Sequence, residues 1–161
     1  MKNRVYSFFT SPVLSLVFRL VLGAIFLYAG IEKACDTLGF AHAIENYQIL
    51  PENLSLLLAA TLPWIEIIVA ISLILGIYAR MGSLVATLLL GIFSCALVIS
   101  LIRGLDITCG CFGNSPASLK INWSCLFRDL AFLAMGLHIF FFDQKLLSIE
   151  RLFLKGKNKG V

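Results

Sequence analysis

The sequence predicts an all-α membrane protein built as a bundle of four transmembrane helices, and two observations support this prediction. Hydrophobic residues make up 60% of the 161-residue chain and charged residues only 14%, whereas a typical soluble domain is about 45–50% apolar and about 25% charged. One small soluble core cannot hide such an excess, because a short chain leaves much of its surface in water. The apolar residues also fall into four long runs separated by polar segments.

The first span is expected at about residues 12–31, after a short basic segment of residues 1–11. A charged start followed by a hydrophobic stretch is also the pattern of a secretory signal. Arg19 interrupts this run, however, the run is about as long as a bilayer is thick, and no clear small-x-small cleavage site follows it. We therefore expect a retained transmembrane helix.

The polar segment of residues 32–53 predicts an outer loop that contains a short amphipathic helix at the membrane interface. A second apolar run covers about residues 54–79 and contains Pro63 and Glu66. It predicts either one helix or a short surface helix followed by a span that begins near Thr61. Residues 80–82 are expected to form a tight turn.

The third span, residues 82–102, has 21 residues without a charge. At about 1.5 Å per residue it covers about 30 Å, the thickness of the hydrocarbon core. Glycine and proline in residues 103–123 predict a second outer loop. The fourth span is expected at about 124–142, followed by a basic tail at 143–161, and the chain as a whole (1–161) is expected to form a single integral-membrane domain.

The distribution of lysine and arginine predicts the orientation of the bundle, since cytoplasmic loops carry the excess of these residues. Eight lie in the two tails and the turn near residue 80: Lys2, Arg4, Arg80, Lys145, Arg151, Lys155, Lys157 and Lys159. Three lie in the two polar segments: Lys33, Arg103 and Lys120. Both termini are thus expected in the cytoplasm, and both polar segments in the periplasm or its equivalent, where disulfides persist.

The candidate site is the Cys109-Gly110-Cys111 segment of the second outer loop. A disulfide across one intervening residue closes a small, strained ring, and strain makes a disulfide more oxidising. Glycine, here Gly110, is the residue best able to adopt the unusual backbone angles that such a ring requires. A structural disulfide, two reduced thiols and a thiolate metal site for zinc or copper are the alternatives.

Two further cysteines lie at predicted outer helix ends, Cys35 after the first span and Cys125 at the start of the fourth. Four cysteines allow three pairings, and the sequence does not choose among them. Their positions favour Cys109 with Cys111 and Cys35 with Cys125. Cys95 lies in the middle of the third span, where we expect it to pack as a small apolar residue.

Charged residues inside predicted spans are costly and mark internal pairing or function. We expect Glu66 to be paired or protonated inside the bundle, and Arg19 to pair with it only if the second span begins at a suitable level. Arg128 and Asp129, close to Cys125 in sequence, either support a thiolate or reach the interface. Structural pairing is the expected role of all four.

Residues 103–113 (RGLDITCGCFG) resemble the signature of the methylamine-utilisation MauE group of the DoxX-like membrane proteins. Gly30-Ile31-Glu32-Lys33, Phe40 through Tyr47 to Leu50-Pro51, and Leu62-Pro63-Trp64-Ile65-Glu66 are also similar to that group. The likeness covers nearly the whole chain with four spans, and its specific part is Cys-Gly-Cys-Phe-Gly. Asp106 and Gly110 belong to this motif, whereas Cys35 and Cys125 do not.

The resemblance implies a partner of periplasmic thioredoxin-like proteins, associated with disulfide formation in exported proteins. In the namesake system the client is the small subunit of methylamine dehydrogenase. We therefore expect a thiol–disulfide redox protein of the bacterial inner membrane, with Cys109 and Cys111 as the exchanging pair. Cys35 and Cys125 could pass electrons to a lipid-soluble acceptor such as a quinone, although no quinone pocket can be read from the sequence.

The alternatives are a non-catalytic scaffold or chaperone subunit with a structural disulfide, and a metal-handling membrane protein. No metal is expected to be resident. The sequence has no basic stripe interleaved with aromatic residues on a polar face, so it gives no support to nucleic-acid binding.

Overall fold

The computed structural model describes residues 12–104 and 123–142, which form five α-helices and no strands. The helices are α2 (Pro12–Cys35), α3 (Thr37–Asn46), α4 (Glu52–Leu75), α5 (Ala79–Ile102) and α6 (Trp123–Phe142). Within these residues, every helix except α3 is long and apolar enough to cross a membrane. The prediction of an all-α bundle of four transmembrane helices is confirmed.

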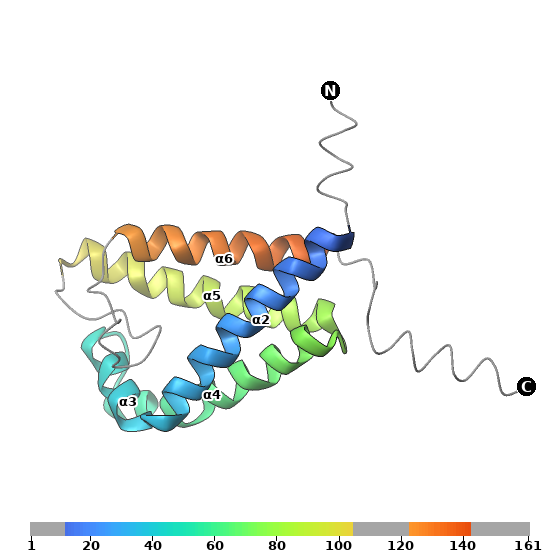
Figure 1. Ribbon diagram of the computed structural model, residues 1–161. Coiled ribbons are helices and arrows are strands. Elements are labelled where there is room, and N and C mark those ends of the chain that lie inside the picture. The colour runs from blue at the N-terminus through green and yellow to red at the C-terminus, as the bar shows by residue number, and fades with distance from the viewer. Residues whose placement is uncertain (1–11, 105–122, 143–161) are drawn as a thin grey trace, which may run out of the picture.

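The long helices alternate in direction along the bundle (Figure 1). The start of α2, the link between α4 and α5, and the end of α6 lie at one end, which we call the link end. The end of α2, helix α3, the end of α5 and the start of α6 lie toward the other end, the α3 end. Helix α2 packs along α4, and α5 packs along α6. Both polar segments of the sequence therefore begin at the same end of the bundle.

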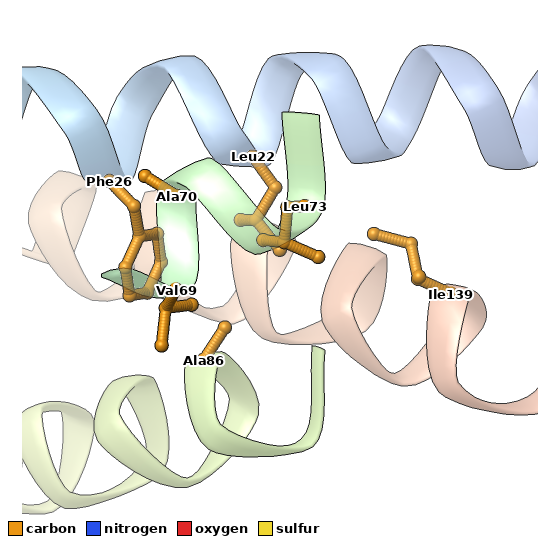
Figure 2. Close-up of a cluster of buried hydrophobic side chains, with 7 residues drawn as sticks. All are labelled: Leu22, Phe26, Val69, Ala70, Leu73, Ala86 and Ile139. Carbon is orange, nitrogen blue, oxygen red and sulfur yellow. The ribbon is translucent and has the colours of Figure 1, made fainter. Parts of the chain in front are cut away.

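The core of the bundle is formed by apolar side chains from all four long helices (Figure 2). Leu22, Ala70, Leu73 and Ala86 are fully buried, and Phe26 lies beside them. Helix α6 contributes Ile139, which is also fully buried. This cluster holds the four helices together near the middle and the link end of the bundle.

Two glycines let the backbones of α2 and α4 approach closely. A Cβ atom on Gly30 would lie 3.0 Å from the carbonyl oxygen of Pro63, and one on Gly23 would lie 3.3 Å from that of Ala70. Small residues at helix contacts allow this approach in membranes, where packing replaces the hydrophobic effect as the driving force. The seven-residue spacing of Gly23 and Gly30 places both on one face of α2.

The end of α2 and the link between α4 and α5 differ from the sequence prediction, and the start of α4 follows one of the two predicted alternatives. Helix α2 continues to Cys35 rather than ending near residue 31, because its polar last turn still makes contacts inside the bundle. The link between α4 and α5 lies at residues 76–78, where Gly76 and Tyr78 have φ angles of 72° and 51°. Residues 80–82, expected to form the turn, belong to α5. Helix α4 is continuous from Glu52, so no separate surface helix precedes the second span.

The bundle exposes large apolar side chains on its outside. Ile68, Ile92, Phe127 and Phe141 are each more than 65% exposed. Soluble proteins rarely expose apolar surface on this scale, whereas a lipid-facing surface must be apolar. The outer surface and the helix lengths therefore both fit a protein that crosses a membrane.

Helix α3 is the short helix predicted in the first outer loop. The side chain of Asp36 accepts a hydrogen bond from the backbone N–H of Gly39 (2.9 Å), which caps its start. Phe40 and Ala41 pack against Ala59 of α4, while Leu38 on the other side is exposed. The helix is therefore amphipathic and anchored on α4; its position at the membrane interface stays a prediction.

We expect Gly30→Leu to lower the free energy of unfolding by about 1–3 kcal/mol, because a larger side chain must push α2 away from the backbone of α4. Gly91→Leu is the matched control, since a Cβ atom on Gly91 would meet nothing within 4 Å. The control should change the free energy by less than about 0.5 kcal/mol. Unfolding titrations of both variants in mixed micelles measure this, and equal losses would contradict the close α2–α4 contact.

Candidate functional site

The predicted reactive segment, Cys109, Gly110 and Cys111, lies outside the described residues, as does Asp106. The structure places the two helices that flank it. Helix α5 ends at Ile102 and α6 begins at Trp123, both at the α3 end of the bundle (Figure 1). The site can therefore be built from the residues that face this end.

Cys35 and Cys125 lie at the helix ends where the sequence placed them, Cys35 as the last residue of α2 and Cys125 in the first turn of α6. No disulfide joins the two to each other. Cys35 is exposed, whereas Cys125 is buried against Tyr47 and Leu97. Helices α2 and α6 diverge toward this end of the bundle (Figure 1). The structure thus holds the two thiols in different surroundings rather than joined.

Glu66 forms a buried ion pair with Lys33. The Nζ atom of Lys33 donates a hydrogen bond to Oε1 of Glu66 at 2.5 Å, and both side chains are more than nine-tenths buried. The pair joins the last turn of α2 to the middle of α4. Gly30, one turn before Lys33, brings the two helices close enough for this contact, since its α-carbon also lies beside Glu66.

Two aromatic rings complete the surroundings of the Lys33 ammonium. Its Nζ atom lies 5.1 Å from the ring centre of Phe40 in α3 and 5.7 Å from that of Phe93 in α5. Aromatic faces attract a cation at such distances, and the attraction grows when water is excluded. Lys33 therefore makes contacts with α3, α4 and α5 from its position on α2.

Asp129 and Arg128 add a second pair of opposite charges from α6. Nη2 and Nε of Arg128 each lie 3.4 Å from Oδ1 of Asp129, and Asp129 is buried while Arg128 is partly exposed. Neighbouring residues on a helix point in different directions, which explains the long contact. Lys33, Glu66, Arg128 and Asp129 all line one cavity. The structure thus brings together three of the predicted charged residues and one that was not predicted.

A cavity of about 310 Å³ lies between the long helices and touches all four of these charged residues. Its remaining walls are apolar and come from each of the long helices: Ile25, Phe26, Ala29, Leu58, Leu62, Leu89, Leu90, Ile92, Phe93 and Phe132. Largely apolar pockets with a few convergent polar groups are the usual form of small-molecule sites. This cavity is the candidate functional site.

A second cavity of about 350 Å³ adjoins the first and is apolar. Leu58, Leu62, Ile92 and Phe93 line both cavities. Side chains of α3 and the exposed thiol of Cys95 line the far part. Cys95, predicted to pack as a small apolar residue, lies exposed at the surface of an apolar groove.

Arg19 is not the partner of Glu66. It is buried in α2, and its guanidinium group lies against Gly76, which ends α4 in a left-handed conformation. The carboxyl end of a helix attracts a cation because its last carbonyl groups carry partial negative charge. Arg19 therefore stabilises the link end, and Glu66 belongs to the α3 end.

Lys33 is the residue that reasoning from the sequence missed. Hydropathy ends the first span near residue 31, before Glu32, and so places Lys33 in the outer loop. The signal that could have found it is periodicity. Leu22, Phe26, Ala29 and Lys33 follow the three- and four-residue spacing of one helix face, and all four are buried.

The chain is similar to a family of methylamine utilisation proteins. The family model described as Methylamine utilisation protein MauE matches residues 11–142. The protein of that name from Paracoccus denitrificans is 31% identical over 133 residues, which cover 82% of this chain and 71% of that protein. The protein of that name from Methylorubrum extorquens is 32% identical over 129 residues, covering 78% of this chain and 69% of that protein. No solved structure matches the chain.

We expect Lys33→Met to lower the free energy of unfolding by about 3–5 kcal/mol, because the substitution leaves the carboxylate of Glu66 buried without its cation. The double variant Lys33→Met/Glu66→Leu should recover most of this loss, since it removes both charges and keeps apolar volume. A double-mutant cycle in mixed micelles measures the coupling. Additive losses from the two single variants would show that the residues do not act as a pair.

Proposed function

Because the chain belongs to the family of methylamine utilisation protein MauE, we propose that it is a membrane thiol–disulfide redox protein of the bacterial inner membrane. Cys109 and Cys111 exchange electrons with a periplasmic thioredoxin-like partner and so support disulfide formation in exported proteins. The observation that carries the proposal is the Cys-Gly-Cys segment itself, which lies within the matched residues.

The layout of the bundle supports an exposed position for this segment. Helix α5 ends and α6 begins at the α3 end, opposite the first residue of α2 and the last of α6. With Lys33 buried in α2, the polar segments at the α3 end keep only Arg103 and Lys120 of the chain's basic residues. The stronger charge asymmetry favours a periplasmic α3 end and cytoplasmic termini.

The proposed exchange follows from thiol chemistry. A thiolate of the partner attacks one sulfur of the Cys109–Cys111 disulfide, and a mixed disulfide forms while the other cysteine leaves as a thiolate. The second thiol of the partner then attacks the mixed disulfide. The partner gains a disulfide, and this chain keeps two electrons as a dithiol. Strain in the small ring favours this direction.

We expect Cys111→Ala, mixed with the oxidised thioredoxin-like partner, to accumulate a mixed disulfide, because the Cys109 thiolate attacks the partner's disulfide and the Cys111 thiol that would complete exchange in this direction is missing. Cys95→Ala, which removes a thiol from the third transmembrane helix, is the matched control and should trap nothing. Non-reducing electrophoresis after acid quenching and alkylation measures the adduct. Absence of an adduct in both Cys111→Ala and Cys109→Ala would favour a scaffold with a structural disulfide.

The second pair, Cys35 and Cys125, is proposed to act as one unit that relays electrons. Residues acting as a unit are non-additive, so Cys35→Ser and Cys125→Ser should slow repeated turnover of the partner equally, and the double variant should be no slower. Steady-state oxidation of the reduced partner measures this. Normal turnover by both single variants would leave the activity to Cys109 and Cys111 alone.

A further inference from the structure

At the polar end of the candidate cavity the charges balance, but one buried hydrogen-bond acceptor has no donor. Lys33 and Arg128 face Glu66 and Asp129 in the same cavity, so two positive charges meet two negative ones. Oε1 of Glu66 accepts the hydrogen bond from Lys33, but Oε2 is buried and has no hydrogen-bond partner among the described residues. A buried acceptor without a donor is costly, and each one in a native structure calls for a partner.

The same end also offers hydrogen-bond donors. An ammonium group has three N–H donors, and Lys33 uses one of them on Oε1 of Glu66. The cavity therefore presents donors for a carbonyl oxygen and an acceptor for a hydroxyl group. A ligand that alternates between a carbonyl and a hydroxyl form can satisfy it in both forms.

The rest of the cavity requires the ligand to be amphipathic. Four lining residues are shared with the neighbouring apolar cavity, so the two spaces adjoin. Ile92, which lines both cavities, is 69% exposed, so both cavities border the apolar outer surface of the bundle. A flat polar head fits the charged end, and an apolar chain fits the groove toward the lipid.

We propose that this cavity binds a lipid-soluble quinone, with its ring at Lys33 and Glu66 and its apolar chain along the Leu58–Ile92 groove. The inference rests on the proposed function, because the electrons come from the dithiol of Cys109 and Cys111, whether or not Cys35 and Cys125 relay them. Two S–H bonds break and one S–S bond forms. The two electrons and two protons go to the quinone, whose carbonyl groups become the two hydroxyl groups of a quinol.

Charge decides against a bilayer phospholipid as the occupant. A phosphate head group would bring a negative charge beside the buried carboxylates of Glu66 and Asp129, while the two cations already have these carboxylates as partners. Desolvating an unbalanced charge is expensive. A neutral quinone head adds no charge to the two cations and two carboxylates of the cavity. Once the quinone is reduced, a hydroxyl group of the quinol supplies the hydrogen-bond donor that Glu66 lacks.

The test uses the full chain in phospholipid nanodiscs with a photoreactive azido-quinone that carries an isoprenoid chain. Labelling should saturate, compete with unlabelled ubiquinone-2 and map to residues that line the cavity. Leu58→Trp, at the junction of the two cavities, should weaken saturable labelling at least about tenfold by filling the space. Leu57→Trp is the matched control, because Leu57 is the exposed neighbour on the same helix and lines neither cavity; its labelling should change less than about twofold.

Labelling that does not saturate, or that falls equally on the exposed face of α4 in both variants, would mean partition into the bilayer only and would overturn the proposal. A second measurement separates it from the proposed function. One turnover of pre-oxidised chain with reduced thioredoxin-like partner needs no quinone. If that turnover proceeds but the cavity takes no quinone, this inference fails alone. If the quinone binds as expected but no turnover occurs, the proposed function fails.

Discussion

The buried ion pair between Lys33 and Glu66 is the constraint on which the α3 end of the bundle depends. Removing both charges from water is expensive, and only close geometry compensates for it. The 2.5 Å hydrogen bond and the two aromatic rings beside Nζ provide that geometry. They hold only if α2, α3, α4 and α5 keep one register. The pair therefore fixes the relative position of four helices rather than simply adding stability.

The glycine contact between α2 and α4 and the cavity both follow from this arrangement. Gly30 lets α4 approach one side of α2, and the Lys33–Glu66 ion pair joins the two helices one turn further on. On the other side, α4 and α5 are linked tightly at residues 76–78 but separate toward the α3 end (Figure 1). Apolar side chains leave the space between them partly unfilled, and the charged groups lie at its inner wall. At the opposite end of the bundle, the link end, the Arg19 cation lies against Gly76 at the carboxyl end of α4 and stabilises that helix terminus.

The four spans could be predicted because their signal is hydrophobic length, which lipid imposes on every transmembrane helix. Their ends could not, since the hydropathy of a residue does not report whether its side chain has a partner. Hydropathy places Lys33 beyond the end of the first span, and yet it is one of the most buried residues of α2. Glu66 was expected to be paired, and the structure supplies the partner, because only tertiary packing decides which helix faces it. The Cys-Gly-Cys segment lies outside the described residues, so its chemistry still rests on the sequence.

The chain between Cys111 and helix α6 is long enough to span the distance from the start of α6 to the cavity. Asp129, at the cavity, lies six residues into α6, which is about 9 Å along the helix from Trp123. Cys111 precedes Trp123 by twelve residues, and a chain of that length spans at most about 40 Å. The covalent connection therefore does not prevent a dithiol at the α3 end from meeting a quinone head at Lys33 and Glu66. The buried pair would then serve two purposes with one geometry, because the contacts that keep the helices in register also leave one carboxylate oxygen free for the ligand.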